Sequence, residues 1–171
     1  MSIDAQQYKT YNNVIDTIKC IGDNHLQIFA VTTGDIWQID LEKNTKYPLM
    51  HINPVSVVAS PSMLTMNFQI FIMDLVEPDL ANEQEVQSDT LQIATDIISL
   101  FMHSETLYQT STTVGQQARY FTEENGSFTL EPFQERFDNV LCGWVFTLPV
   151  QVQNLYDTCN TPFTNGEICL K

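Results

Sequence analysis

The sequence predicts an α+β fold with a largely antiparallel sheet, on which an N-terminal helix and a central helix pack. Two stretches, residues 2–22 and 90–104, carry apolar side chains at helical spacing. Two others, residues 64–76 and 140–152, have the two-residue period of long strands. Because helices and strands follow one another without a regular βα alternation, we expect mostly hairpin-connected strands with the helices on one face.

Length and cysteine content fit one domain. The 171 residues are expected to form a single domain, 1–171, with a core over residues 1–153 and an irregular C-terminal tail over residues 154–171. Four cysteines in a chain of this length do not indicate a disulfide scaffold, so free thiols are expected. Whether Cys159 and Cys169 pair in the tail is left open, and a structural zinc site there would need four ligands.

Charge disfavours several classes of partner. The chain has 7 basic and 21 acidic residues, a net charge of −14. Tight binding to nucleic acid or to an anionic membrane is therefore not expected, because both depend on Lys and Arg. No apolar run is long enough to span a membrane, and the first residues lack the basic and apolar segments of a secretory signal. We therefore expect synthesis in the cytosol.

The first part of the chain predicts a helix and then a hairpin. Ser2 can cap the helix over residues 2–22, and Gly22 can end it in a left-handed conformation. Residues 26–31 and 36–41 are apolar runs separated by a short turn that contains glycine, which is typical of a β-hairpin.

Prolines organise the next segment. Tyr47-Pro48 is an extended dipeptide that leads into a strand over residues 49–52. Pro54 and Pro61 enclose residues 55–59, which we expect to be at most an edge or irregular strand.

The strand over residues 64–76 is apolar on both faces. One face carries Met66, Phe68, Ile70 and Ile72, and the other carries Phe71, Met73 and Leu75. A strand of this kind is covered on both sides. We expect a helix to cover one face and a neighbouring subunit to cover the other.

An acidic stretch, residues 77–89, separates this strand from the central helix. It contains no base, and its acidic residues are Glu77, Asp79, Glu83, Glu85 and Asp89. Asn82, followed by a glutamate three residues later, fits a capping box, and Ser88 is a second candidate cap. A solvated helix start is the ordinary interpretation, since acidic residues stabilise a first turn. The predicted helix then buries Leu91, Ala94, Ile97, Ile98, Phe101 and Met102.

After the central helix we expect a loop, a hairpin and a long strand. Residues 105–117 are rich in Ser, Thr and Gln, and Glu124-Asn125-Gly126 marks a hairpin between residues 118–123 and 127–131. Residues 132–138 are expected to connect it to the last strand. Pro149 places the end of that strand at an edge or a bulge.

No catalytic or metal-binding arrangement is evident in the sequence. His25, His51 and His103 fall in different elements at no ligand spacing, and the serine-hydrolase, phosphate-loop, dinucleotide and zinc-hydrolase motifs are missing. Asp74 and Asp96 could meet as a carboxylate pair, but two separate solvated aspartates are the ordinary interpretation. We therefore expect no enzyme activity, no metal and no cofactor.

What remains is an interaction surface. The apolar residues Phe71, Met73 and Leu75 need more cover than one helix supplies, and oligomerisation is the usual way to provide it. Closed rings are one outcome when the contacts are heterologous.

Several stretches carry a resemblance to a known family. They are the amphipathic N-terminal helix, the entry Tyr47-Pro48-Leu49-Met50-His51, and FQIFIMDLV followed by the acidic linker and SDTLQIATDII. With these features, residues 3–160 resemble the tail terminator (tail completion) proteins of tailed bacteriophages, small α+β virion proteins that form a ring between head connector and tail. The last part of the chain also looks like neck proteins of phages that infect Bacteroidetes, including crAss-like phages. This part runs from Glu131-Pro132-Phe133 through DNVLCGWVFTLPVQV to Asp157-Thr158-Cys159.

The resemblance implies a structural role in the virion. Copies would form a homo-oligomeric ring, hexameric in long-tailed phages, that docks on neighbouring connector and tail proteins. Genomic DNA would pass through the lumen without tight binding, and residues 77–89 or 105–117 would make lumen or inter-ring contacts. Another tail component (tube or baseplate) and a small soluble ligand-binding domain are the alternatives.

Overall fold

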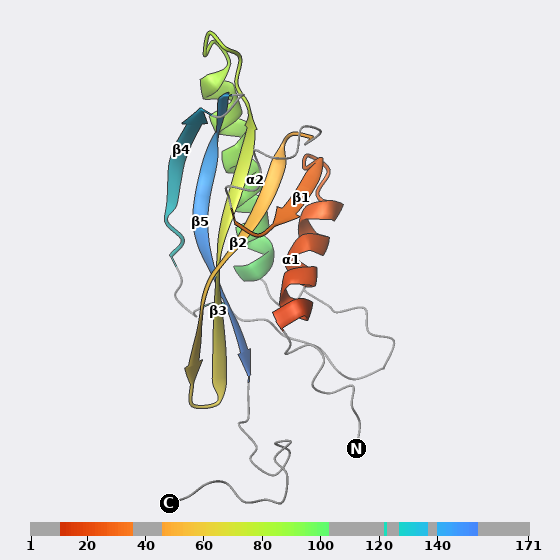
Figure 1. Cartoon of the computed structure of the whole chain (residues 1–171), viewed down its shortest axis with the longest axis vertical. Helices are drawn as coiled ribbons and strands as arrows, with labels where there is room; N and C mark the ends of the chain where they lie inside the picture. The colour runs from red at the N-terminus through yellow and green to blue at the C-terminus, as the bar shows by residue number, and fades with distance from the viewer. Residues whose placement is uncertain (1–10, 36–45, 103–121, 123–126, 137–139, 154–171) are drawn as a thin grey trace, which may run out of the picture.

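The computed structural model describes residues 11–35, 46–102, 122, 127–136 and 140–153 (Figure 1). These residues form a mixed sheet in the strand order β1-β2-β3-β5-β4, with β1 parallel to β2 and the other pairs antiparallel. The fold is α+β, as predicted. The elements in chain order are α1 (Tyr11–Asn24), β1 (Ala30–Thr33), β2 (Leu49–Ser60), β3 (Met63–Leu75), α2 (Glu83–Met102), β4 (Leu130–Arg136) and β5 (Val140–Gln153).

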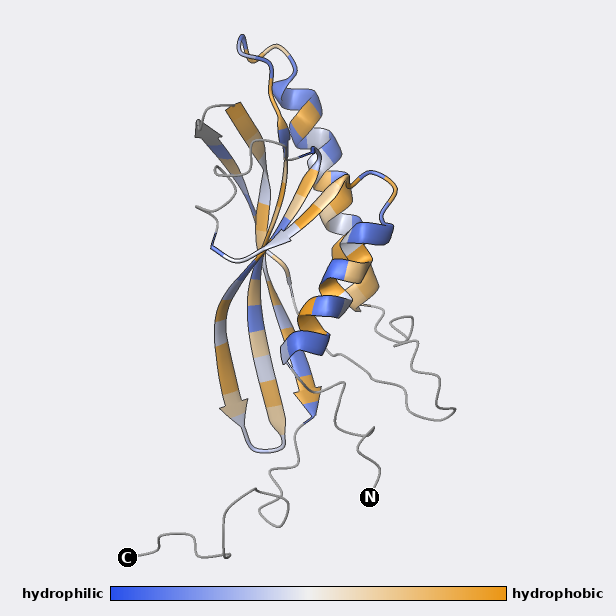
Figure 2. Cartoon of the chain, turned by 45° about the vertical axis from the view of Figure 1, so that its right-hand side comes forward, coloured by the Kyte–Doolittle hydropathy of each residue, from blue (hydrophilic) through white to orange (hydrophobic). Residues whose placement is uncertain are grey.

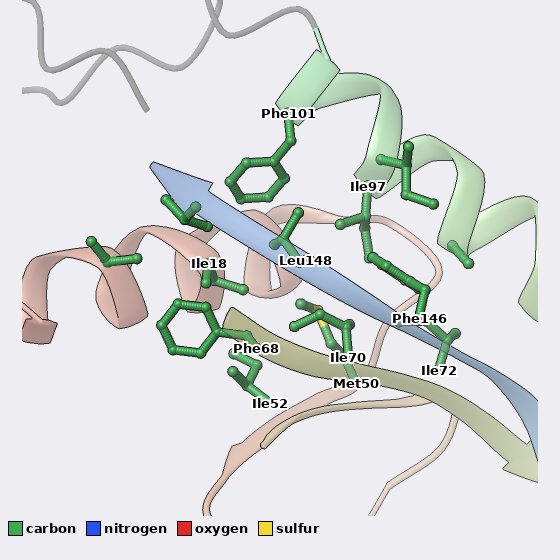
Figure 3. Packing of buried hydrophobic residues seen from close by; sticks show 14 of the residues in the cluster. Ile18, Met50, Ile52, Phe68, Ile70, Ile72, Ile97, Phe101, Phe146 and Leu148 are labelled. Atoms are coloured by element: carbon green, nitrogen blue, oxygen red, sulfur yellow. The ribbon is translucent and has the colours of Figure 1, made fainter. Parts of the chain in front are cut away.

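Both helices lie on the same side of the sheet (Figure 2). The main core lies between them and the strands, and β2, β3 and β5 direct alternate side chains into it. Figure 3 shows Ile18 of α1, Ile97 and Phe101 of α2 and several strand residues meeting in this core. The largest fully buried side chains are Phe68, Phe101 and Phe146. Their burial stabilises the fold by roughly 1.5–3 kcal/mol each.

Helix α1 runs past Gly22, so the predicted left-handed ending at this glycine is wrong. The helix ends at Asn24, whose side-chain amide donates to the carbonyl of Cys20 at 2.7 Å. Gly22 instead permits a close approach between helix and sheet. A Cβ atom there would lie 2.7 Å from both Met50 Sδ and Val31 Cγ2.

Strand β1 begins later than predicted and pairs differently. Residues 26–29 are not strand, and the Leu26 side chain is 96% exposed. Ala30–Thr33 pairs in parallel with the first residues of β2. The predicted hairpin partner, residues 36–41, lies outside the described residues.

Strand β2 is a continuous strand that tolerates Pro54 at a bulge. The pairing with β3 shifts register between Pro54 and Ser56, and β1 no longer accompanies β2 there. Residues 55–59 are thus confirmed as an edge strand, but they continue β2 instead of forming a separate or irregular piece. A tight turn at Pro61-Ser62, with Ser62 at a φ of 67°, connects β2 to β3.

The second face of β3 is covered by the chain itself, which corrects the expectation that a neighbouring subunit covers it. Phe71 and Met73 are 8% and 1% exposed, and they pack with Leu49, Leu141, Tyr47, Phe133, Ala30 and Val145. The rings of Phe71 and Phe133 meet edge to face at 5.6 Å. Leu75, at the end of the strand, remains 40% exposed.

Helix α2 begins at Glu83, so the first of the two candidate caps was correct. The carbonyl of Asn82 accepts from the Val86 amide at 3.0 Å, while Ser88 lies inside the helix. The Asn82 side chain does not complete the predicted box and instead accepts from the Glu77 amide at 2.8 Å. Met102 was predicted to lie on the buried face of the helix, but its side chain is 58% exposed.

The last two strands confirm one prediction and correct another. Strand β5 matches the predicted long strand, and Pro149 lies beyond the part that pairs with β4. Residues 130–136, expected mainly as a connector, form β4 at the sheet edge, where Pro132 is tolerated. The predicted loop over 105–117, the turn at 124–126 and the tail over 154–171 lie outside the described residues.

Candidate assembly surface

Beyond β1 and β4 the sheet narrows to three strands. Strand β1 pairs only with residues 49–52 of β2, and β4 pairs only with residues 140–146 of β5. The remaining lengths of β2, β3 and β5 extend together to the hairpin tip at Pro61-Ser62 (Figure 1). We call this part, residues 53–69 and 147–153, the arm.

The arm is uncharged in a strongly acidic protein. No Asp, Glu, Lys, Arg or His occurs in residues 52–73 or 139–153, although the chain has a net charge of −14. The acidic residues of the described chain lie on the helices, on the turns, at the end of β3 and on β4. The hairpin tip and the acidic turn before α2 lie at opposite ends of the long axis (Figure 1).

The face of the arm that points away from the helices is polar and accessible to solvent. The strand registers place side chains in rows across β2, β3 and β5, and none of these side chains is buried. Two cross-strand hydrogen bonds link them, from Asn53 Nδ2 to Gln69 Oε1 at 3.4 Å and from Asn67 Nδ2 to Ser56 Oγ at 3.1 Å. We call this set the polar face: Asn53, Ser56, Val58, Ser60, Met63, Thr65, Asn67, Gln69, Thr147, Pro149, Gln151 and Gln153.

Apolar side chains are exposed along the β2 edge of the arm. Val55, Val57 and Val58 are 58%, 51% and 52% exposed, whereas Met66 and Val150 on the neighbouring strands are buried. Val58 lies on the polar face, whereas the pairing of Val57 with Met66 places Val57 on the side that faces the helices.

A hollow of about 430 Å³ borders the polar face where β4 begins. Phe128 and Phe146 meet edge to face beside it, with ring centroids 6.3 Å apart. Its polar lining includes Asn67, Gln69, Ser127, Thr129, Glu131 and Thr147.

The acidic candidates from the sequence lie around the turn between β3 and α2. Glu77, Asp79 and Glu85 are exposed, and Glu83 is half-buried. Asp79 Oδ1 accepts from the Ala81 amide at 3.2 Å, so this carboxylate stabilises the turn. The apolar candidates Phe71 and Met73 are buried against other side chains of the same chain, so neither is available for contact with a partner.

Asp74 and Asp96 do not form a carboxylate pair. Asp96 instead lies 3.5 Å from His25 Nε2, and Asp74 Oδ1 accepts from the Leu75 amide at 2.7 Å. Burial raises the pKa of Asp74; the Leu75 hydrogen bond opposes this, and the nearby Asp89 charge adds to it. Within the described residues, no group of three or more His, Cys, Asp or Glu side chains could hold a metal ion.

Cys142 is buried at the same end of the sheet. Burial raises the pKa of its thiol to about 11, and the charges of Glu83 and Asp74 add to this shift. The protonated thiol is a poor nucleophile, so Cys142 has a packing role.

His51 joins β1 to β2 in the interior. Its Nε2 lies 3.1 Å from the Gly34 carbonyl, which can only accept, so this nitrogen carries the proton. Nδ1 then accepts from the Thr32 hydroxyl at 2.8 Å. Burial lowers the pKa of His51, more than the Gly34 hydrogen bond and the Asp35 charge raise it. His103 lies outside the described residues.

Neither a protein-family model nor a curated protein matches this chain. Among the described residues, no helix is long and apolar enough to cross a membrane.

Sequence reasoning placed an apolar contact surface on Phe71, Met73 and Leu75, of which the structure buries the first two. It did not single out the arm. The available signal was the absence of charge from residues 52–73 and 139–153 in a chain with 21 acidic residues. The sequence does not show that these two uncharged stretches lie together. Only the pairing of β2, β3 and β5 brings them onto one surface.

Proposed function

We propose that this protein is a structural subunit of a tailed-bacteriophage virion that forms a ring at the head–tail junction, as a tail terminator or neck protein. The ring joins the head connector to the tail and lets the genome pass through its lumen. The protein has no catalytic role in this proposal. The resemblance over residues 3–160 supports it.

The arm is the observation that carries an assembly role. A charge-free, solvent-accessible face beside exposed valines, in a chain of net charge −14, offers a place where acidic subunits can approach. At physiological salt, exposed like charges still repel within a Debye length of about 8 Å. Removing them from one surface is therefore a way to permit dense packing.

The acidic turn fits the lumen or the contact with the next ring. Glu77 and Asp79 are exposed in this turn, and Glu85 is exposed in the first turn of α2. The turn lies at the opposite end of the molecule from the arm tip (Figure 1). A wall with this charge repels phosphates and lets DNA slide without adhering. Tight binding of the purified protein to duplex DNA at low salt would contradict this part of the proposal.

Imaging of the protein within purified virions tests the proposal directly. We expect density for this fold in a closed ring between connector and tail, at six or more copies. A single copy per virion, a location in the capsid shell or absence from the particle would refute it. Placement in the tube or baseplate would establish the alternative structural role.

The hollow beside Phe128 supports a second candidate, a small ligand-binding domain. Its volume of about 430 Å³ lies within the range of about 300–1,000 Å³ that ligand sites occupy. Amide chemical shifts recorded against a small-molecule fragment library test this candidate. Reproducible shifts at Gln69 and Thr147 that the Phe128→Ala variant abolishes would favour it.

A further inference from the structure

We infer that the polar face of the arm is the contact through which one copy of this chain binds another in solution. This inference goes beyond the proposed function, because two copies that meet through the same face are related by a two-fold axis, whereas a ring closes through heterologous contacts. Three features of the arm favour this contact: its blocked strand edges, its lack of charge and the chemistry of its side chains.

Prolines oppose association through the arm's strand edges. The Pro48 and Ile52 carbonyls accept from the Phe29 and Gly34 amides, which flank β1, at 2.9 and 3.1 Å. The backbone groups of even-numbered residues therefore face the β1 edge of β2 up to the bulge. Pro54 therefore has its missing N–H on the open edge. In β5 the Val140 carbonyl accepts from the Val76 amide at 2.9 Å, so the backbone groups of even-numbered β5 residues face β3. The odd-numbered Pro149 therefore faces the opposite edge of β5, which is open beyond β4. Proline at these positions blocks strand addition.

Absence of charge favours a second copy over other partners. A basic protein or a metal would be attracted to the acidic helices and turns, and nucleic acid needs Lys and Arg that the arm lacks. A second copy carries the same net charge of −14, so it can approach closely only where that charge is missing. The polar face meets this condition over the accessible length of β2, β3 and β5.

The side chains of the polar face are also self-complementary. Each Asn and Gln amide both donates and accepts, and the Ser and Thr hydroxyls do the same, so two copies of this face can satisfy one another. Two carboxylate surfaces cannot, because both only accept. Val58 and Met63 add apolar area to the same face.

Paired charge substitutions on the full chain test the inference. Thr65 and Gln151 are register partners on this face, so we compare Thr65→Glu/Gln151→Glu and Thr65→Lys/Gln151→Lys with the parent. Gln92→Glu/Ser99→Glu on the exposed side of α2 adds the same charge away from the arm. Sedimentation velocity over a wide concentration range gives the association constant, and far-ultraviolet circular dichroism checks folding.

The parent is expected to self-associate, and both arm variants should raise the dissociation constant at least about tenfold, while the α2 control leaves it within about threefold. The lysine pair is decisive because it lowers the net negative charge. Stronger association of that variant would show that only net charge matters and would overturn the inference. If a Thr65 variant unfolds, Ser60→Glu/Gln153→Glu tests the same face near the tip.

A parent that stays monomeric at every concentration would overturn this inference alone, because a virion ring can still form on docking to the connector. Unaffected association in the arm variants would do the same and would place the contact elsewhere. The proposed function is refuted separately, by virion images that lack the ring.

Discussion

Replacing Gly143 with alanine tests how closely β3 and β5 approach. Gly143 pairs with Met73, and a Cβ atom on it would lie 1.9 Å from the Ile72 carbonyl oxygen and 2.9 Å from Met73 Cα. These are backbone atoms of the adjacent strand, so no side-chain rotation can relieve the contact. The strands must separate instead.

The cost follows from that displacement. An ordinary contact of 3.4 Å minus the 1.9 Å found here requires about 1.5 Å of movement, a large fraction of the roughly 4.8 Å spacing between strands. Two ladder hydrogen bonds lost at about 0.5–1.5 kcal/mol each, together with about 1–3 kcal/mol of repacking, give about 2–6 kcal/mol. This is a large part of the roughly 5–15 kcal/mol that stabilises a typical domain.

Gly22→Ala is the matched control. The added Cβ would also be crowded, at 2.7 Å from Met50 Sδ and Val31 Cγ2, but these are side-chain atoms that can shift. A helical alanine gains about 0.8–1 kcal/mol over glycine, which offsets part of an overpacking cost of about 1–3 kcal/mol. We therefore expect a net loss of about 0–2 kcal/mol.

Urea unfolding followed by circular dichroism at pH 7 measures both variants. We expect Gly143→Ala to unfold at much lower urea than the parent and Gly22→Ala to unfold near it. If Gly143→Ala loses less than about 1 kcal/mol, or Gly22→Ala loses as much, then backbone apposition is not what requires Gly143.

Three further predictions concern titration, a turn hydrogen bond and reactivity. His51 has a lowered pKa when folded, so the free energy of unfolding should decrease as the pH falls below the unfolded value of about 6.5; urea midpoints against pH should show a shallower decrease for His51→Gln. Asn82→Ala removes the acceptor of the Glu77 amide and should cost about 0.5–1.5 kcal/mol in urea unfolding, whereas a loss near zero would show that this hydrogen bond does not stabilise the turn. Iodoacetamide at pH 8 should modify the exposed Cys20 but leave Cys142 unmodified until urea unfolds the chain, as peptide mass spectrometry would reveal.

Long strands with a clear two-residue period were predicted to within a residue. Residues 64–76 and 140–152 correspond to Met63–Leu75 and Val140–Gln153, because one face of each packs on the helices over its whole length. The two-residue period of apolar side chains is enough to predict the bounds of a strand when one face of that strand is buried along its whole length.

Other features depended on tertiary contacts that local sequence does not contain. Glycine is common at helix ends, which is why the sequence predicted an end at Gly22. The structure requires a glycine there because Met50 lies so close to the helix. Residues 130–136 contain Pro132 and so were expected mainly as a connector, although a sheet edge accepts this proline. Phe71 and Met73 were assigned to a subunit contact because the sequence does not show that Tyr47 and Phe133 cover them.

The distribution of charge connects the fold to the proposed assembly. The arm's side chains toward the helices are mostly buried, so solubility does not depend on them, but its polar face is accessible and still lacks charge. A sheet face exposed only to water gains solubility from Lys and Glu, and edge strands gain protection from them. Here Pro54 and Pro149 protect the edges without any charge. A surface that blocks strand addition yet omits repulsive charge is suited to close contact with a similar molecule, and in the proposed ring the acidic turn at the opposite end would be free to face DNA.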